Sequence, residues 1–445
     1  MLQALRIFKD VRSFQEIFER ITWDMIKKLL VLPMILFIIS PLSLLIHTSF
    51  QFWYLEQTIS STNMFVMEYA AFVLLLCAFK AASERRSLRT LVRRNPVILF
   101  FGCFCVLILI STAANPTAVY AFEGTWRMEY FYSYLIYVCC YFGCTAFINS
   151  ERAKCILIRM LQVVSMIQVV IVYLDRILIR IEPFHRGQYA NTITSVYSNQ
   201  NFYAYYLTIV ILVSAALFLR TEHKGWRIFD GACFLLNAFT LMQSDTLGCF
   251  FATLIGLIFL GVMLYIIDHR IEWGVAMLIA VYLFVFALDW MMNDTLFASM
   301  ITMVFDMQRI AFNDADAGSA GSGRWSLWVH TVQYISERPL LGWGAEGIFD
   351  RLNDEAYNSR PHNEILQYAA FFGIPAALCY FAGVFSVFLH GLRHKNELDA
   401  YTIAALAGAF GYLVSSCFGN TVYSIAPFFF CILGLAVRPC RKPAK

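Results

Sequence analysis

Three basic side chains stand out in a polar stretch of an otherwise apolar chain. The stretch runs for about seventy residues from Trp290 to His362 and contains Arg324 and Arg360, with His362 at its end. A guanidinium stays charged and offers a planar fork that matches phosphate oxygens. A histidine can take a proton from a hydroxyl near neutral pH. These residue types therefore predict a site that binds a phosphorylated substrate and moves a proton.

Each of these residues also has a simpler interpretation, which the sequence leaves open. His362 stands where the next apolar segment begins, so it can equally be a helix cap or an interfacial residue. Arg324 follows the Gly321–Gly323 segment and precedes apolar residues at helical spacing. It can bind an anion at the start of that helix, or pair with Asp314 or Asp316.

Other polar residues stand at the expected ends of apolar segments. Asn199 and Asn201 precede one such segment, where their amides can bond sugar hydroxyls or only cap a helix. Asp245 lies in a very short turn between two apolar segments, where an acid can be functional although turn chemistry alone tolerates it. Asn363 directly follows His362, and a helix is expected to open at or near it.

The composition indicates which elements must position these residues. The chain has 445 residues, of which 60% are hydrophobic and 14% charged, and a mean hydropathy of +0.63. Soluble domains carry about a quarter charged residues, so these values indicate a polytopic membrane protein. Segments of roughly 20 apolar residues span a bilayer, and they must be helices because lipid leaves backbone groups without partners. Twelve segments qualify, centred on Phe37, Ala70, Leu107, Val138, Ser165, Ile211, Asn237, Gly256, Val281, Ala376, Phe410 and Cys431.

The predicted fold class is therefore an all-α polytopic membrane protein with about twelve transmembrane helices. Residues 1–445 form one integral membrane domain, and residues 291–362 form one large loop between the ninth and tenth spans. Within that loop, apolar spacing predicts a helix over Arg324–Ser336, followed by a turn-rich stretch from Pro339 to Gly347.

The distribution of lysine predicts the orientation of the chain. With twelve spans both termini lie on one side, and every lysine falls on that side, namely Lys9, Lys27, Lys28, Lys80, Lys154, Lys224, Lys395, Lys442 and Lys445. Because positive residues are retained in the cytoplasm, that side is expected to be cytoplasmic and the large loop extracytoplasmic. Loops on the opposite side carry only arginine as a cation. We expect most of these arginines to pair with carboxylates of the loop and two or three to face a ligand.

Four motifs occur in an order that resembles a known family. They are G-R-x-x-x-W at Gly323–Trp328, P-L-x-G-x-G at Pro339–Gly344, H-N-x-x-L at His362–Leu366, and a glycine eleven residues after the histidine at Gly373. Together with the many apolar spans, this order resembles the superfamily of O-antigen ligases and Wzy-type polymerases, which are bacterial membrane glycosyltransferases of GT-C type. The specific part covers residues 321–373, about an eighth of the chain.

The resemblance implies a donor, an acceptor and a place in the cell. The donor would be an undecaprenyl-pyrophosphate-linked oligosaccharide, the acceptor a sugar hydroxyl, and no metal or other cofactor would be needed. His362 would be the base, while Arg324 and Arg360 would hold pyrophosphate. The protein would lie in the bacterial inner membrane with its active site on the extracytoplasmic face, in contact with the lipid bilayer. A flippase and chain-length regulator proteins are the expected protein partners, and nucleic acid is not one.

The chain also departs from the family pattern in ways that affect the site. Many members have a Ser-Arg pair where this chain has Ser244 and Asp245, and ligases are described with leucine at the position of Trp328. A phosphate contact is therefore also sought at Arg180 or Arg186, in the external segment before the sixth span. The segment Asn199 to Asn201 resembles the family's Asn-Pro-Asn element, with glutamine in place of proline.

Three functional hypotheses follow from the sequence. The leading one is a polymerase that joins lipid-linked repeat units for a capsule, O-antigen or other cell-surface polysaccharide. The second is a ligase that moves the finished glycan to another acceptor. The third, from a different class, is a twelve-helix transporter or flippase. Transporters place ionisable groups near the bilayer midplane, and here Glu68 and Arg159 form only a thin set.

Overall fold

The structure is a computed structural model of the whole chain. It describes residues 97–437 apart from short gaps at 117–118, 124–128, 149, 180–192, 194, 196, 198, 313, 315 and 357–359, together with five residues between 16 and 25. The predicted spans centred on Phe37 and Ala70 lie outside the described residues. So do Arg180, Arg186 and Glu68.

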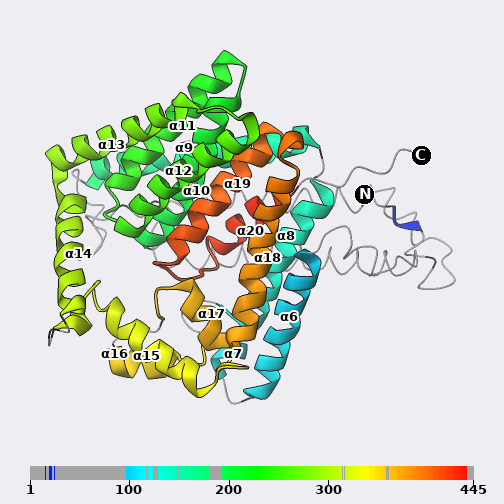
Figure 1. Ribbon diagram of the computed structural model, residues 1–445, viewed down its shortest axis with the longest axis vertical. Helices are drawn as coiled ribbons and strands as arrows, with labels where there is room; N and C mark the ends of the chain where they lie inside the picture. The colour runs from blue at the N-terminus through cyan, green and yellow to red at the C-terminus, as the bar shows by residue number, and fades with distance from the viewer. Residues whose placement is uncertain are drawn as a thin grey trace.

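The described part of the chain is helical, as the composition predicted (Figure 1). Ten of the twelve predicted centres fall inside described helices. Six of these helices are long and apolar enough to cross a membrane: α6 (Val97–Ala114), α9 (Glu151–Ile179, apolar over Glu151–Leu174), α10 (Gln200–Arg220), α12 (Leu247–Asp268), α13 (Trp273–Asn293) and α18 (Ile374–Arg393). The other four centres fall in α8 (Phe131–Phe147), α11 (Lys224–Met242), α19 (Ala400–Ser416) and α20 (Ala426–Leu435).

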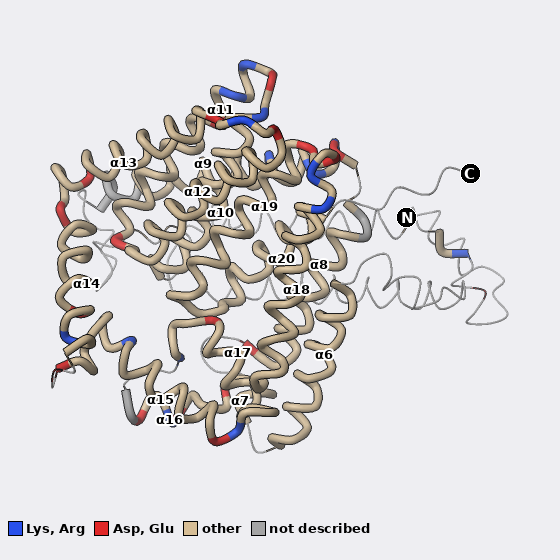
Figure 2. Tube along the Cα trace, in the orientation of Figure 1, with Lys and Arg blue, Asp and Glu red and all other residues tan. Residues whose placement is uncertain are grey.

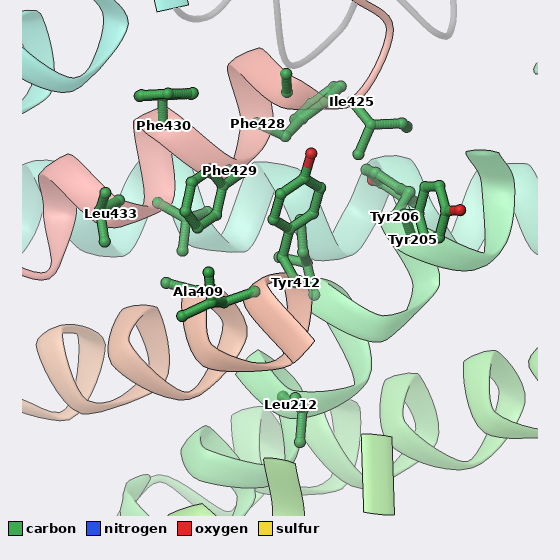
Figure 3. Close-up of a cluster of buried hydrophobic side chains, with 14 of the residues drawn as sticks. Tyr205, Tyr206, Leu212, Ala409, Tyr412, Ile425, Phe428, Phe429, Phe430 and Leu433 are labelled. Atoms are coloured by element: carbon green, nitrogen blue, oxygen red, sulfur yellow. The ribbon is translucent and has the colours of Figure 1, made fainter. Parts of the chain in front are cut away.

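Helix α10 forms the centre of the bundle, with α9, α11, α12 and α19 packed against it. Its side chains from Tyr203 to Leu217 are all buried. Small residues allow this close packing, because a Cβ added at Gly256 of α12 or at Gly411 of α19 would overlap the side chain of Leu212. Figure 3 shows the aromatic part of this core, which joins α10 to α19 and α20. There Tyr412 stacks on Phe429 with ring centroids 4.4 Å apart.

Charged residues gather near the ends of the helices and leave the middle of the bundle largely uncharged (Figure 2). At the end that carries the described lysines, Lys154 bonds Asp399 at 3.2 Å, and Arg220 bonds Asp268 at 2.5 Å. The buried Arg159 pairs with Asp230. This ion pair accounts for a charge inside the bundle, so a transport function is not needed to explain it.

The segment predicted as a polar loop contains more helix than the sequence indicated. Helix α15 (Arg324–Glu337) agrees with the prediction, and α16 (Phe349–Ala356) follows it. Helix α14 (Thr295–Ala311) was not predicted. It follows α13 after the single residue Asp294. This residue adopts a left-handed conformation (φ 42°), which changes the direction of the chain between α13 and α14.

The helix predicted after His362 begins as expected but is broken. Asn363 caps α17 (Glu364–Phe372), its side chain accepting a hydrogen bond from Leu366 N at 3.1 Å. The helix stops at Gly373, which has a φ of 89°, and α18 begins at the next residue. The helix expected to open near Asn363 is therefore interrupted at Gly373 instead of running on without a break into the span centred on Ala376.

The break at Gly373 is stabilised by the P-L-x-G-x-G motif. Trp343 N donates to Ala370 O at 2.9 Å, and Gly344 N donates to Phe371 O at 2.8 Å. Within a helix the N–H of residue 375 would bond Phe371 O, but Pro375 has no N–H and leaves that carbonyl open. The motif thus supplies the hydrogen bonds that the broken helix lacks.

We expect Gly373→Ala to destabilise the protein by about 1–3 kcal/mol, because alanine is strained at a positive φ. A Cβ there would also lie 2.2 Å from Leu340 O. The thermal midpoint in detergent measures the effect. Gly102→Ala in α6 is the matched control, since a Cβ at that position meets nothing within 4 Å. Equal midpoints for the two variants would contradict the role of Gly373.

Candidate functional site

Several of the predicted site residues lie where helices begin. Thr246 Oγ1, just before α12, lies 3.5 Å from Asn201 Oδ1 in the first turn of α10. Ser299 of α14 donates to Asp245 at 2.9 Å. Helices α15 and α17 pack against each other, and a hydrogen bond from Trp328 to Pro361 O brings the beginning of α15 next to the segment before α17. The positive ends of helix dipoles therefore face this region, which favours a bound anion.

Arg324 has no carboxylate partner in the part of the loop that the structure describes. It is the first residue of α15, it is partly exposed, and it forms no ion pair with any residue that the structure describes. Its charge acts on Cys249 in the first turn of α12, so Arg324 lies on the side of the bundle where α12 begins. The predicted alternative, a pair with Asp314 or Asp316, is not formed.

Trp328 connects Arg324 to the histidine. It lies one turn after Arg324 on α15, so the two side chains share a helix face. Its indole N–H donates to Pro361 O at 2.8 Å, directly before His362. The tryptophan that departs from the ligase pattern therefore holds the histidine segment against the helix that carries the arginine.

His362 is held in an unusual backbone conformation. Its φ is 50°, in the left-handed region that few residues other than glycine adopt, and its side chain is partly buried. The backbone N–H of His362 donates to Asn420 Oδ1 at 2.8 Å. The amide nitrogen of Asn420 lies 3.2 Å from the ring nitrogen Nδ1. Asn420 therefore fixes both the backbone and the ring of the histidine.

Two of the secondary candidates are helix caps. Asn199 caps α10 by accepting from Asn201 N at 2.8 Å, and Asn363 caps α17 as described above. The simpler interpretation accounts for both residues. Asp245 remains available at the site, because it is exposed in the turn between α11 and α12. Local burial of its carboxylate raises the pKa of Asp245, although the bond from Ser299 opposes that change.

Arg360 occupies a place different from the one predicted. It is fully buried and pairs with two buried carboxylates, Glu129 at 2.7 Å and Glu346. It also donates to Thr421 O at 2.8 Å. Two carboxylates and one carbonyl already engage this guanidinium. We therefore assign Arg360 a structural role: it joins the segments before α8, α16 and α20 to the histidine loop.

Glu129 has an unusual titration in this buried cluster. Burial raises the pKa of Glu129 to about 7, while the positive charge of Arg360 opposes that rise. The hydroxyls of Tyr134 and Tyr137 donate to the same carboxylate at 3.3 and 3.2 Å. The carboxylate is therefore fully engaged inside the protein and is not exposed to a ligand.

The remaining described arginines of the loop agree in part with the expected pairing. Arg309 pairs with Asp306 at 3.4 Å. Arg338 donates to Asn115 at 2.5 Å and stacks over Trp343 at 3.9 Å, and Arg351 lies over the same ring at 4.3 Å. Aromatic faces thus replace carboxylates for two of them. The absence of a metal requirement remains a prediction.

Sequence reasoning missed three residues that hold the site together. Glu129 and Glu346 are isolated acids in loops, and their spacing from Arg360 is 231 and 14 residues. Asn420 lies between the last two spans, 58 residues from His362. A short polar turn between spans was the only local signal, and turn chemistry explains such a turn equally well.

These features define a helical protein of membrane type with a partly exposed arginine and a clamped histidine at one end of its bundle. Comparison with known families agrees with this class. The family model described as O-antigen ligase matches residues 232–381, a segment that includes Asp245, Arg324, Arg360 and His362. No curated protein matches the chain. Over this segment the chain is therefore similar to the O-antigen ligase family. Proteins of that family are glycosyltransferase-like enzymes, and the similarity supports an enzyme here.

Proposed function

We propose that the protein polymerises lipid-linked glycan repeat units at the extracytoplasmic face of the bacterial inner membrane. The donor is a glycan on undecaprenyl pyrophosphate, and the acceptor is a hydroxyl of another repeat unit. The family match supports transfer of lipid-linked glycans in general. Polymerisation, the lipid carrier and the face of the membrane are parts of the proposal.

One observation supports the proposal most strongly, namely that Arg324 has no carboxylate partner among the described residues. A partly buried guanidinium normally pairs with an anion, because a charged group that loses contact with water and gains no partner destabilises the protein. Its position at the start of α15, beside the start of α12, suits the pyrophosphate of a lipid-linked donor. His362 is then the side chain that meets the reacting oxygen atoms, with Trp328 fixing the spacing between the two residues.

The transfer needs no metal in this proposal. The bond from the anomeric carbon to pyrophosphate breaks and its electron pair leaves with the pyrophosphate. The acceptor hydroxyl loses its proton to a base or to water, and its oxygen bonds to the same carbon. Direct attack inverts that carbon. Arg324 and the helix starts stabilise the charge that develops on the leaving group.

The test is polymer formation by purified protein from a lipid-linked repeat unit in EDTA. A repeat unit alone suffices for a polymerase, whereas a ligase needs a different acceptor molecule in the assay. Transfer only to that second acceptor would favour the ligase alternative. No transfer in either assay, or a strict metal requirement, would contradict the proposal.

We expect Arg324→Ala to slow transfer roughly ten- to a hundredfold, because it removes a charge-assisted contact of about 1.5–3 kcal/mol. Arg324→Lys should restore only part of the rate, since an ammonium acts as a point charge. The thermal midpoint should stay unchanged, since the structure shows no ion pair to lose. Arg309→Ala is the matched control, because that exposed arginine pairs with Asp306. Full activity of the Arg324→Ala variant would contradict the proposed contact between Arg324 and the pyrophosphate.

The orientation is tested by labelling from outside the cell. A membrane-impermeant thiol reagent should modify Ser322→Cys in intact cells and leave Asn396→Cys unmodified until the cells are opened. Both positions are exposed in the structure, and they lie at opposite ends of the bundle. The unsubstituted chain gives the background from its own cysteines. The reverse pattern would place the site in the cytoplasm.

A further inference from the structure

The contact between His362 and Asn420 carries information about the histidine ring. The backbone N–H of His362 can only donate, so the Asn420 atom 2.8 Å from it must be the amide oxygen. The amide nitrogen of Asn420 therefore points to the ring, where it lies 3.2 Å from Nδ1. An amide N–H2 group only donates, so Nδ1 must present its lone pair.

A neutral imidazole carries one proton on one of its two nitrogens. With the lone pair on Nδ1, the proton is on Nε2. Turning the amide over would bring its N–H2 group against the backbone N–H, which loses the 2.8 Å bond and sets two donors against each other. The amide orientation and the position of the ring proton are therefore linked.

Asn420 is held firmly enough to impose this choice. Its side chain is 2% exposed. The next residue, Thr421, donates from Oγ1 to Glu364 at 2.6 Å and from its N–H to Gln367 at 3.2 Å, and its carbonyl accepts from Arg360 at 2.8 Å. These bonds join the loop before α20 to both sides of His362, so neither partner of the contact can shift independently.

We propose that Asn420 is a positioning residue that keeps the proton of neutral His362 on Nε2, so that the imidazole acts in transfer as a hydrogen-bond donor. This inference rests on the proposed function and deepens it, because it changes the chemical role of the histidine. The Nε2–H donates to an oxygen of the bound glycan or its pyrophosphate. The proton of the acceptor hydroxyl passes to Asp245 or to water as the new glycosidic bond forms.

Substitutions at His362 distinguish a hydrogen-bond donor from a base that accepts the proton of the acceptor hydroxyl. The side-chain amide of glutamine places an N–H near the position of Nε2–H but cannot take up a proton near neutral pH. We expect His362→Gln to keep at least about tenfold more activity than His362→Ala. His362→Asn is the matched control, since its shorter amide reaches the position of Nδ1 and should be as inactive as alanine.

A substitution at Asn420 gives a second and opposite test. The carboxylate of Asn420→Asp accepts from the backbone N–H and also from Nδ1–H, which moves the ring proton to Nδ1 and leaves a lone pair on Nε2. We expect at least a tenfold loss of rate, whereas a base at Nε2 would act as well or better in this variant. The nitrogen NMR signals of the histidine rings report the tautomer directly in both proteins.

The proposal is overturned if His362→Gln is no more active than His362→Ala. It is also overturned if Asn420→Asp transfers at or above the wild-type rate, or if NMR places the wild-type proton on Nδ1. If Asn420→Asp does not fold, the glutamine variant and the wild-type NMR spectrum still decide. Failure of the proposed function is a different result, because wild-type protein would then transfer no glycan while its ring tautomer could still be read.

Discussion

Replacing Arg360 with alanine is expected to lower the free energy of unfolding by about 3–5 kcal/mol. The guanidinium is fully buried between Glu129 and Glu346, and its removal leaves two carboxylates without their cation. Leaving buried carboxyl groups without their cationic partner costs far more than losing one contact at the surface, even when one of them takes up a proton. We expect little folded Arg360→Ala protein in the membrane and a clearly lower thermal midpoint in detergent.

A compensating variant distinguishes the structural role from the predicted pyrophosphate contact. Glu129→Gln and Glu346→Gln, combined with Arg360→Met, remove all three charges and should recover much of the midpoint. Arg309→Ala again serves as the control for loss of a loop arginine. A stable Arg360→Ala protein that no longer binds the lipid-linked donor would return Arg360 to the substrate site.

The helices could be predicted from the sequence because lipid imposes a strong local rule. An apolar run of about 20 residues must bond its own backbone, so its helical state does not depend on distant residues. Helix α14 was missed for the same reason: Asp289, Asn293 and Asp294 interrupt the apolar pattern, and nothing local shows that the chain turns and resumes as a helix.

The sequence contains a local signal for the break at Gly373, namely a glycine and a proline two residues apart. Gly373 and Pro375 together cannot continue a helix without a partner for the open carbonyls. The partner is the P-L-x-G-x-G segment about thirty residues earlier, whose backbone N–H groups point at those carbonyls. The motif is one of those that carry the family resemblance. Its physical role is to supply hydrogen-bond donors to the broken helix.

The site residues were predictable as types but not as roles. Arg324 and Arg360 are both arginines beside glycine or proline in the same polar stretch, and no local feature distinguishes their roles. Burial separates them, because Arg360 meets Glu129 and Glu346 while Arg324 meets no described carboxylate. Such differences depend on contacts between segments far apart in the chain, which residue spacing does not encode.

His362→Ala is expected to slow glycan transfer at least roughly a hundredfold while the protein still folds and binds its donor. The size of the loss is that of a positioned proton-transfer group or of a single donor to developing charge. Folding should survive, because the backbone N–H that bonds Asn420 remains in alanine. The positive φ of 50° adds a cost of about 1–3 kcal/mol to the variant. The measurement is the initial rate of polymer formation from a purified lipid-linked repeat unit in EDTA, with donor binding and thermal midpoint recorded on the same preparations.

His330→Ala provides a matched control, since this histidine of α15 is also partly buried and bonds Ser326 at 3.3 Å. It lies on the same helix as Arg324, and its partner Ser326 is on that helix too. A rate near wild type for His330→Ala together with a loss for His362→Ala would locate the chemistry at the start of α17. Wild-type activity in His362→Ala would show that the reaction does not require this histidine. The exposed carboxylate of Asp245 would then be the next group to replace.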